Sequence, residues 1–281
     1  METEVVKGKK IAAQYLDLLK VRIGTEIVKP RLDIIQVGDD YASSKYVDMK
    51  KSVGSSIGID VAVHKFDATY PQKDLVALIT KLNSDPRTSG VMVQLPLPST
   101  MDTKYVLDQI DPSKDVDGLT SMTMDNLQKG TDSYFLPATV RAVIETLKDM
   151  KVDLMNMNAV IVGMGPVVGL PLSYILKPKV KMLSTCDEST PDIKEYTMVA
   201  DLIISATGHP HLIDSSHIKP GAVLVDVGFE IGENGEPIGD INTEDIMGKA
   251  SAIVSSPGGI GPVTVAMLMQ NTYEAFLRNG K

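Results

Sequence analysis

Tyr46 and Lys50 lie four residues apart in the segment YVDMK, and their types and spacing suggest catalysis. On a helix, residues at this spacing share a face, so the phenol and the ammonium would project side by side. The ordinary pKa of a lysine is about 10.4. For Lys50 to exchange protons near pH 7 to 8, burial and cationic neighbours must destabilise its charged form by about 3 to 4 kcal/mol. Lys45 and Lys51 are available as such neighbours. The pair is a candidate acid–base centre, and the alternative is a solvated lysine beside an amphipathic tyrosine.

Strand and helix patterns alternate around this pair. The predicted strands are 31–37, 60–66 and 89–95, and the predicted helices are about 41–57 and 71–83. Such alternation indicates parallel strands that are covered by helices. Tyr46 and Lys50 are therefore expected on the helix that follows the first of these strands.

The second half of the chain repeats this alternation. Its predicted strands are 158–163, 180–186, 201–207, 222–228 and 251–256, and its predicted helices are about 166–177 and 191–200. A helix that begins near Pro137 would connect the halves, and a last helix follows Pro262. We predict an α/β protein of two domains with mainly parallel sheets, the second domain being Rossmann-like. The first domain would comprise residues 1–136 with the C-terminal helix 262–281, and the second residues 137–261.

A glycine-rich turn follows the predicted strand 158–163. It contains Gly163, Gly165 and Gly169, and a helical pattern begins within it. Strand, glycine turn and helix in this order are typical of dinucleotide binding, because backbone N–H groups and the helix N-terminus can approach a pyrophosphate. The spacing is G-x-G-x-x-x-G rather than G-x-G-x-x-G, and the alternative is a tight turn without a ligand.

The residues after the next predicted strand bear on the type of nucleotide. Asp187 and Glu188 stand where a carboxylate accepts hydrogen bonds from a ribose 2′-hydroxyl and repels a 2′-phosphate. They favour NAD over NADP, although three lysines at 177–181 would weaken this preference. Met164 in the glycine turn and Phe229 after a later strand complete the predicted cofactor site.

Composition limits the kinds of partner. The chain has 281 residues, 43% of them hydrophobic, and a formal charge of -8, so its overall field repels nucleic acid and anionic membranes. It lacks a long apolar run and a signal-peptide pattern, and its single cysteine, Cys186, cannot form an internal disulfide. We therefore expect a cytoplasmic protein without nucleic-acid or membrane partners. His209 and His211 have no companions at metal-ligand spacing, so no metal is expected.

Four segments carry a family resemblance. They are VGDDYASSKYVDMK (37–50), VQLPLP (93–98), KDVDGLT (114–120) and PGGIGPVTVAML (257–268). In this order they resemble the methylenetetrahydrofolate dehydrogenase/methenyltetrahydrofolate cyclohydrolase family over nearly the whole chain. The resemblance implies a bifunctional enzyme that oxidises 5,10-methylenetetrahydrofolate with a nicotinamide dinucleotide and hydrolyses the product to 10-formyltetrahydrofolate. It also implies tetrahydrofolate derivatives as ligands and a homodimer.

The resemblance implies roles for individual residues. Lys50 would assist the hydrolysis of the methenyl bridge, Gln94 would contact this lysine and tune its protonation, and Tyr46 would lie at the folate. Asp117 would grip the pterin by accepting from its adjacent N–H and amino donors, although a simple turn before Gly118 would also suit an aspartate. The other implied substrate-site residues are Ser43, Pro257, Gly258, Gly259 and Thr264.

Departures from the family pattern leave alternatives open. The usual nucleotide loop has Arg and Ser where this chain has Met164 and Gly165, and the usual His-Ser after the next strand is replaced by Asp187 and Glu188. Because NADP is the common family cofactor, the resemblance and the local residues disagree. The alternatives to the bifunctional enzyme are a dehydrogenase without cyclohydrolase activity, another nicotinamide enzyme, and a non-catalytic nucleotide-binding protein.

Overall fold

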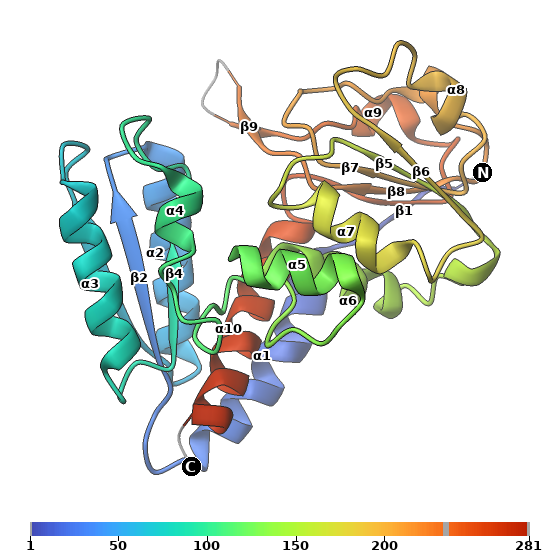
Figure 1. Cartoon of the computed structure of the whole chain (residues 1–281). Helices are drawn as coiled ribbons and strands as arrows, with labels where there is room; N and C mark the ends of the chain where they lie inside the picture. Colours follow the sequence, from blue (N-terminus) through green and yellow to red (C-terminus); the bar gives the residue numbers. More distant parts are fainter. Residues whose placement is uncertain (1, 233–235, 280–281) are drawn as a thin grey trace. The chain divides into compact units, whose positions relative to one another are not determined.

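The chain folds into two compact units. The computed structural model describes residues 2–232 and 236–279 (Figure 1). Residues Ala13–Ala138 and Val265–Lys281 form one unit, which we call the Lys50 unit. Residues Met1–Ala12 and Thr139–Thr264 form the other, which we call the glycine-loop unit. Both contain a parallel sheet accompanied by helices, which confirms the predicted α/β class.

A three-stranded parallel sheet is the centre of the Lys50 unit. Strand β2 lies between β3 and β4, and it pairs with β3 from Arg31, opposite Asp60, to Val37, opposite Phe66. The elements are β2 (Arg31–Val37), α2 (Tyr41–Ser56), β3 (Asp60–Phe66), α3 (Gln72–Ser84), β4 (Gly90–Val93), α4 (Thr103–Leu107) and α5 (Ser121–Lys129). Helices α1 (Gly8–Gly24) and α10 (Ile260–Asn279) belong to this unit for most of their length.

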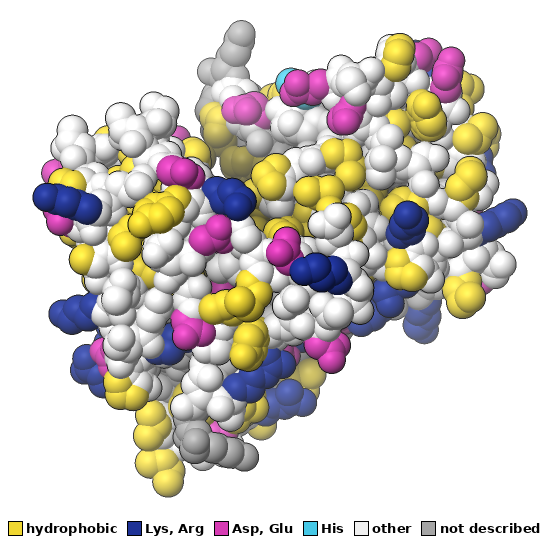
Figure 2. All heavy atoms as spheres, viewed as in Figure 1, with side chains coloured by type: hydrophobic (Ala, Val, Ile, Leu, Met, Phe, Trp, Pro, Cys, Tyr) yellow, Lys and Arg dark blue, Asp and Glu magenta, His cyan; other side chains and the backbone are white. Residues whose placement is uncertain are grey.

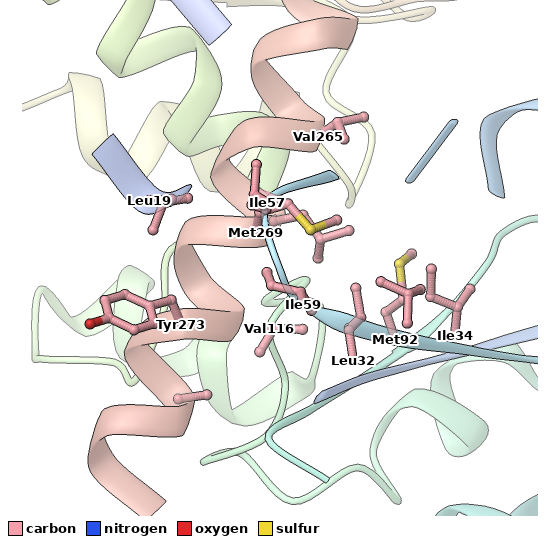
Figure 3. Packing of buried hydrophobic residues seen from close by; sticks show 14 of the residues in the cluster. Leu19, Leu32, Ile34, Ile57, Ile59, Met92, Val116, Val265, Met269 and Tyr273 are labelled. Atoms are coloured by element: carbon pink, nitrogen blue, oxygen red, sulfur yellow. The ribbon is translucent and has the colours of Figure 1, made fainter. Parts of the chain in front are cut away.

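Apolar side chains from the sheet and from α10 form one core in the Lys50 unit. Leu32 and Met92 of the sheet share a cluster with Met269 of α10 (Figure 3). A Cβ on Gly54 of α2 would come within 2.5 Å of a Val61 methyl group, so α2 packs closely against β3. Each fully buried aliphatic side chain contributes about 1.5 to 3 kcal/mol. This packing fixes α2, which carries the Tyr46–Lys50 pair, against the sheet.

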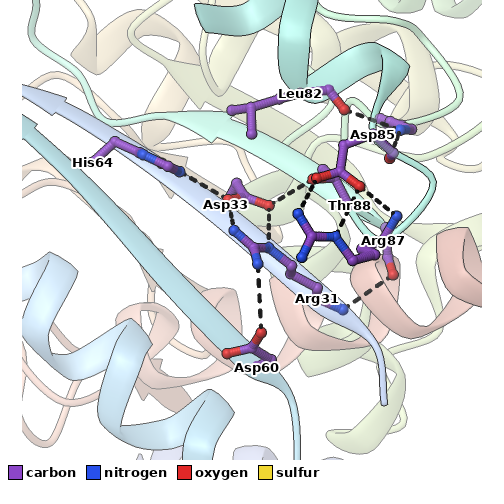
Figure 4. A network of polar contacts seen from close by, with 10 residues as sticks. Arg31, Asp33, Asp60, His64, Leu82, Asp85, Arg87 and Thr88 are labelled. Atoms are coloured by element: carbon purple, nitrogen blue, oxygen red, sulfur yellow. Dashed lines mark hydrogen bonds and ion pairs between the residues drawn. The ribbon is translucent and has the colours of Figure 1, made fainter. Parts of the chain in front are cut away.

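A buried polar network surrounds Asp33 on β2 (Figure 4). The Asp33 carboxylate is fully buried and accepts two hydrogen bonds of 2.9 Å from the Arg31 guanidinium. His64 Nε2 lies 2.8 Å from Asp33 Oδ1, and the Thr88 hydroxyl donates to Oδ2 at 2.9 Å. Burial opposes ionisation of Asp33, but the hydrogen bonds from His64, Arg31 and Thr88 outweigh it and lower the pKa of this carboxyl.

Replacing Asp33 by alanine is expected to destabilise the protein by about 3 to 5 kcal/mol at pH 7, because the buried Thr88 hydroxyl and the partly buried Arg31 and His64 side chains lose their partner. The pKa of Asp33 is lower in the folded protein than in the unfolded chain, where it is about 3.9. The ionised Asp33 therefore stabilises the fold above pH 3.9, and this stabilisation is lost as pH falls toward the pKa of the folded state. Urea unfolding should therefore show that the variant loses less free energy of unfolding, relative to the wild type, at pH 3 than at pH 7. Asp60, whose exposed carboxylate lies 3.8 Å from the same guanidinium, is the control. Its alanine variant should lose less than about 1 kcal/mol, and equal losses at both positions would contradict the argument.

A six-stranded parallel sheet is the centre of the glycine-loop unit. Its strand order is β1-β11-β8-β7-β5-β6. The strands are β1 (Glu4–Val5), β5 (Asn158–Val162), β6 (Met182–Cys186), β7 (Leu202–Ser205), β8 (Val223–Asp226) and β11 (Ala252–Val254). The helices are α6 (Ala138–Asp149), α7 (Gly169–Leu176), α8 (Lys194–Thr197) and α9 (Thr243–Ile246), with short 3₁₀ helices η1 (Leu154–Asn156) and η2 (Ser215–His217). An antiparallel hairpin of β9 (Glu230–Ile231) and β10 (Pro237–Ile238) stands apart from this sheet.

The start of the chain departs from the predicted domain division. The sequence places residues 1–136 in the first domain, whereas β1 pairs with β11 in the glycine-loop unit, with Glu4 opposite Ala252. A strand of two residues is too short to show an alternating pattern, so the sequence does not indicate it. Helix α7 also begins later than predicted, because the residues before Gly169 form the glycine turn.

Charged side chains of both signs are mixed on the molecular surface. Basic and acidic side chains are interspersed on the face drawn in Figure 2, and the whole chain has 28 Lys and Arg against 36 Asp and Glu. Among the helices of the described residues, none combines the length and the apolar character that a membrane crossing requires.

Candidate active site

Helix α2 presents Lys50 on its buried face. The chain leaves β2 through Gly38, whose φ of 91° favours glycine. Asp40 then caps α2, because its carboxylate accepts from the backbone N–H of Ser43 at 2.7 Å. The buried residues of this helix recur at helical spacing and are Ser43, Val47, Lys50 and Gly54. Lys50 therefore points toward the sheet rather than into solvent.

Lys50 is a buried amine with two neighbours that the sequence predicts. The residue is 4% exposed, and Nζ donates to Gln94 Oε1 at 2.8 Å. The same Nζ lies 4.4 Å from the centre of the Tyr46 ring, which is within the range of a cation–π contact. The three predicted catalytic residues thus lie together within the Lys50 unit.

The side chain of Gln94 is held in one orientation. Its backbone N–H donates to the Ile35 carbonyl at 2.8 Å, which continues the pairing of β4 with β2. Its Nε2 donates to the Leu95 carbonyl at 2.7 Å, so Oε1 is the atom that faces Lys50. The Ser43 hydroxyl donates to the same Leu95 carbonyl at 3.4 Å. Because an amide oxygen accepts from an ammonium or from a neutral amine, the contact persists when Lys50 changes its protonation state.

Burial lowers the pKa of Lys50 to about 8, and the negative charge of Asp117 opposes this shift. At pH 7 about a tenth of the amine is therefore neutral. The expected contribution from Lys45 and Lys51 is wrong, because both side chains are exposed and Lys45 lies over the Tyr41 ring. The amine owes its altered acidity to desolvation.

Asp117 lies near the same amine. Burial raises the pKa of Asp117 to about 6, the charge of Lys50 opposes this rise, and the neighbouring Asp115 adds to it. The Asp117 backbone carbonyl accepts from the Ala138 N–H at 3.1 Å. Within residues 2–232 and 236–279, no hydrogen bond reaches its carboxylate oxygens. A partly buried carboxylate with free acceptor positions suits a ligand that presents two adjacent N–H donors.

Two residues that position Asp117 were not predicted to do so. Asp115 is buried, and its carboxylate accepts from the backbone N–H groups of residues 118–120 at 2.9 to 3.2 Å. Asn271 of α10 donates to the Val116 carbonyl at 2.8 Å. Asp115 and Asn271 therefore fix the backbone on both sides of Asp117. The turn signal before Gly118 could have indicated the role of Asp115. Nothing local indicates the role of Asn271, because it lies 155 residues from Val116.

The glycine turn of the other unit borders a pocket of about 800 Å³. Side chains are excluded at two of its glycines, since a Cβ on Gly163 would lie 2.4 Å from the Ala206 carbonyl and one on Gly169 would lie 1.8 Å from the Gly163 carbonyl. A Cβ on Gly165 would meet no atom within 4 Å, so open space adjoins the backbone there. The pocket is lined by Val162, Gly163, Met164, Gly165, Asp187, Glu188, Ser189, Thr190, Ile193, Ala206, Thr207, His209 and Leu212. Its size and its exposed backbone fit a dinucleotide.

The predicted cofactor residues do not all reach this pocket. Asp187 and Glu188 line it, together with Met164. Asp187 Oδ1 accepts from the Ser189 N–H at 2.9 Å and from the Ser189 hydroxyl at 2.6 Å, and these hydrogen bonds lower the pKa of Asp187. Asp187 is therefore ionised at neutral pH. Phe229 is 53% exposed and is not among the lining residues.

The predicted proline-glycine loop, 257–259, also lies in the glycine-loop unit. The Gly8 N–H donates to the Gly258 carbonyl at 3.1 Å, and a Cβ on Gly8 would lie 1.7 Å from the Gly259 carbonyl oxygen. Thr264 is buried in α10, whereas Pro257 is exposed. The start of α1 therefore supports this loop, and its role in substrate binding stays a prediction.

Comparisons with known proteins agree with this architecture. Two family models match the chain, the catalytic domain of tetrahydrofolate dehydrogenase/cyclohydrolase over residues 6–117 and its NAD(P)-binding domain over residues 137–280. The bifunctional protein FolD of Acetivibrio thermocellus is 38% identical over 278 residues, which cover 98% of this chain and 97% of that protein.

Solved structures give the same result. The bifunctional FolD of Campylobacter jejuni has a TM-score of 0.94 at 37% identity, with 98% of this chain and 99% of that chain covered. The FolD of Trypanosoma brucei, solved with NADP cofactor and an inhibitor, has a TM-score of 0.95 at 28% identity, with 100% and 99% covered. The chain therefore belongs to the tetrahydrofolate dehydrogenase/cyclohydrolase family.

Proposed function

We propose that the chain is a bifunctional enzyme of one-carbon metabolism. It oxidises 5,10-methylenetetrahydrofolate to 5,10-methenyltetrahydrofolate and hydrolyses this product to 10-formyltetrahydrofolate. The observation that carries the proposal is the buried Lys50 amine, with a pKa of about 8 and a contact of 2.8 Å to Gln94. A non-catalytic nucleotide-binding protein gives no reason for a buried amine that titrates near neutral pH.

Lys50 moves the protons of the hydrolytic step. Water adds to the methenyl carbon, and the neutral amine accepts a proton from the attacking water. The ammonium that results remains hydrogen-bonded to Gln94 Oε1, so it is not left unpaired in its buried position. It then donates a proton to the folate nitrogen as the carbon–nitrogen bond breaks. The hydroxyl group that water has formed on the carbon gives up its proton to solvent as it becomes the formyl C=O, so one proton is released overall. Tyr46 supports the charged form through its ring, and its contact with the folate is part of the proposal.

Asp117 orients the folate. Its ionised carboxylate accepts hydrogen bonds from the adjacent N–H and amino donors of the pterin, which form a pair that matches two carboxylate oxygens. Asp115 and Asn271 hold the backbone beside it, so the chain that carries this carboxylate is already in place when the ligand binds. Ser43 and the loop 257–259 are proposed as further substrate contacts.

The glycine-loop unit provides the site for the nicotinamide dinucleotide. When bound, this cofactor accepts the hydride from the methylene carbon. The backbone of residues 163–165 would hold the pyrophosphate, and Asp187 and Glu188 would hold the adenosine ribose. The chain itself contributes binding and orientation to this step, because the folate nitrogens stabilise the cation that forms.

We expect NAD to be used with a kcat/KM roughly tenfold or more above that for NADP, because the ionised Asp187 repels a 2′-phosphate. The double replacement of Asp187 by serine and Glu188 by arginine should move the preference toward NADP, since arginine binds phosphate with a fork of N–H donors. Steady-state oxidation with each cofactor measures both ratios. A wild-type preference for NADP would show that these acids do not set the cofactor choice, and the reaction class would stand.

One assay tests the proposed function as a whole. The formation and decay of methenyltetrahydrofolate are followed after methylenetetrahydrofolate is added with NAD or NADP. Formation followed by decay is the expected result. Accumulation without decay would leave only the dehydrogenase, and no formation with either cofactor would overturn the proposal. The homodimer that the family resemblance implies and the cytoplasmic location that the sequence composition suggests stay predictions, and light scattering of the purified protein tests the first.

A further inference from the structure

A second buried lysine, Lys114, lies three positions before Asp117 and has no part in the proposed mechanism. The residue is 7% exposed. Its Nζ donates to three backbone carbonyls at the end of α3, those of Leu82 at 3.1 Å, Asn83 at 2.8 Å and Asp85 at 2.8 Å (Leu82 and Asp85 are labelled in Figure 4). An ammonium has three N–H donors, so all the donors of Lys114 are used within the protein. This side chain therefore acts on the fold and not directly on a ligand.

The three acceptors suit the charged form of Lys114. The last carbonyls of a helix have no partner within it and form the negative end of its dipole, so a cation is stabilised at the end of α3. Burial lowers the pKa of Lys114, and the charges of Asp111, Asp85 and Asp33 oppose this effect. A side chain without N–H donors at position 114 would remove three hydrogen bonds at once.

The backbone of Lys114 lies beside β4. Its carbonyl accepts from the Val91 N–H at 2.8 Å, and an isolated parallel bridge is formed here with β4. A Cβ on Gly90 would lie 2.5 Å from a Val116 methyl group, so β4 and the segment 114–116 are in close contact. Lys114 thus connects the end of α3, through its side chain, and β4, through its backbone, with the segment that leads to Asp117.

Both β4 and this segment lead to the active site. Strand β4 ends at Val93, and the next residue, Gln94, contacts the Lys50 amine. The segment ends at Asp117, which is close enough for its charge to oppose the lowering of the pKa of Lys50 by burial. The place of the Asp117 carboxylate relative to Gln94 therefore depends on how the segment is held beside β4. Lys114 holds the beginning of this segment.

We propose that Lys114 is a positioning residue for folate binding, because its ammonium fixes the segment that carries Asp117 to the end of α3. The inference rests on the proposed role of Asp117 in gripping the pterin. Without the ammonium, the segment keeps its bridge to β4 but loses three hydrogen bonds to α3, so the carboxylate is less well placed for the ligand. A displacement of about 1 Å can cost about 100-fold in an active site, and we expect Lys114→Met to bind tetrahydrofolate about 10- to 100-fold more weakly.

A double-mutant cycle shows whether Lys114 acts through Asp117. Tetrahydrofolate is titrated by calorimetry into the wild type, Lys114→Met, Asp117→Ala and the double variant, at a temperature where all four are folded. In the Asp117→Ala protein, the additional Lys114→Met change should weaken binding by less than about twofold, because the group that it positions is already absent. An equal loss in both backgrounds would show a general effect on the fold and would overturn the inference.

The same titrations separate this inference from the proposed function. If Asp117→Ala weakens binding and Lys114→Met does not, only the positioning role is wrong. If Asp117→Ala binds tetrahydrofolate like the wild type, the proposed folate contact is wrong, and the positioning role is overturned with it.

Lys29 is a matched control, because its Nζ also binds carbonyls at the end of a helix. It donates to the carbonyls of Ile23 at 2.8 Å, Gly24 at 3.5 Å and Glu26 at 2.7 Å, where α1 ends. The segment 25–30 carries none of the proposed site residues. Lys29→Met and Lys114→Met should both melt at a lower temperature than the wild type, but Lys29→Met should keep its affinity for tetrahydrofolate. A similar loss of affinity in both variants would overturn the inference.

Lys114→Gln keeps the test decisive if Lys114→Met does not fold. Glutamine provides two N–H donors on a shorter side chain, so it should retain part of the connection to α3 and lose less affinity than methionine. In that case Lys114→Gln takes the place of Lys114→Met in the cycle, and wild-type affinity in this variant would overturn the inference. If neither variant folds, the ammonium is a requirement of the fold as a whole, and the positioning role is wrong.

Discussion

Replacing Lys50 by methionine is expected to lower hydrolysis of methenyltetrahydrofolate by about 10²- to 10⁴-fold, the usual contribution of a positioned acid–base group. Methionine fills a similar volume but provides no amine, so the attacking water loses its proton acceptor. Folate should still bind, because Asp117 is unchanged. The Gln94 Oε1 atom would lose its donor, at a cost of about 1 to 3 kcal/mol in stability. Decay of added methenyltetrahydrofolate, compared with folate affinity, measures the two effects separately.

Lys51→Met is the matched control, because Lys51 is the adjacent lysine on α2 and its side chain is exposed. It should hydrolyse at the wild-type rate. In the wild type, the rate should rise with pH, reach about half its maximum near pH 8 and level off above it, because burial of Lys50 makes the neutral amine available in this range. Hydrolysis that survives in Lys50→Met, or a rate that falls as pH rises from 6 to 8, would remove this amine from the mechanism.

The pairing of Tyr46 with Lys50 could be predicted because its signal is local, since helical spacing places both side chains on one face. The contact of Gln94 with Lys50 was implied by the family resemblance instead, and the structure gives its physical basis, because β4 ends at Val93 and Gln94 continues its pairing with β2. The alternation of strands and helices, which indicates a parallel sheet, can likewise be recognised from short segments of the sequence. These features depend on neighbours within a few residues or on the general order of a parallel sheet.

Other features of the site depend on long-range packing and could not be predicted. Asn271 supports the Asp117 loop from the last helix, and only the packing of α10 against the core brings it there. The sequence suggests burial and cationic neighbours as possible causes of the lowered pKa of Lys50, and only the fold shows that burial is the cause.

Replacing Asp117 by alanine is expected to weaken folate binding by about 10²- to 10⁴-fold and so to reduce both activities. Two hydrogen bonds to a charged group contribute about 1.5 to 3 kcal/mol each, and the Asp117 carboxylate has no other hydrogen bond among the described residues. The loss of folate binding should appear as a higher KM for both reactions, because the carboxylate binds the part of the folate that does not react. Unchanged folate affinity in this variant would contradict the assignment.

The pH dependence of binding distinguishes this gripping role from a structural one. Burial raises the pKa of Asp117 to about 6, and only the ionised form accepts from both pterin donors. Folate affinity of the wild type should therefore fall as pH drops below 6, whereas the affinity of Asp117→Ala should be independent of pH in this range. Asp125→Asn, which alters an exposed aspartate on the next helix, should keep the wild-type profile. If Asp117→Ala retained the fall below pH 6, another group would have to be the acid that binds folate.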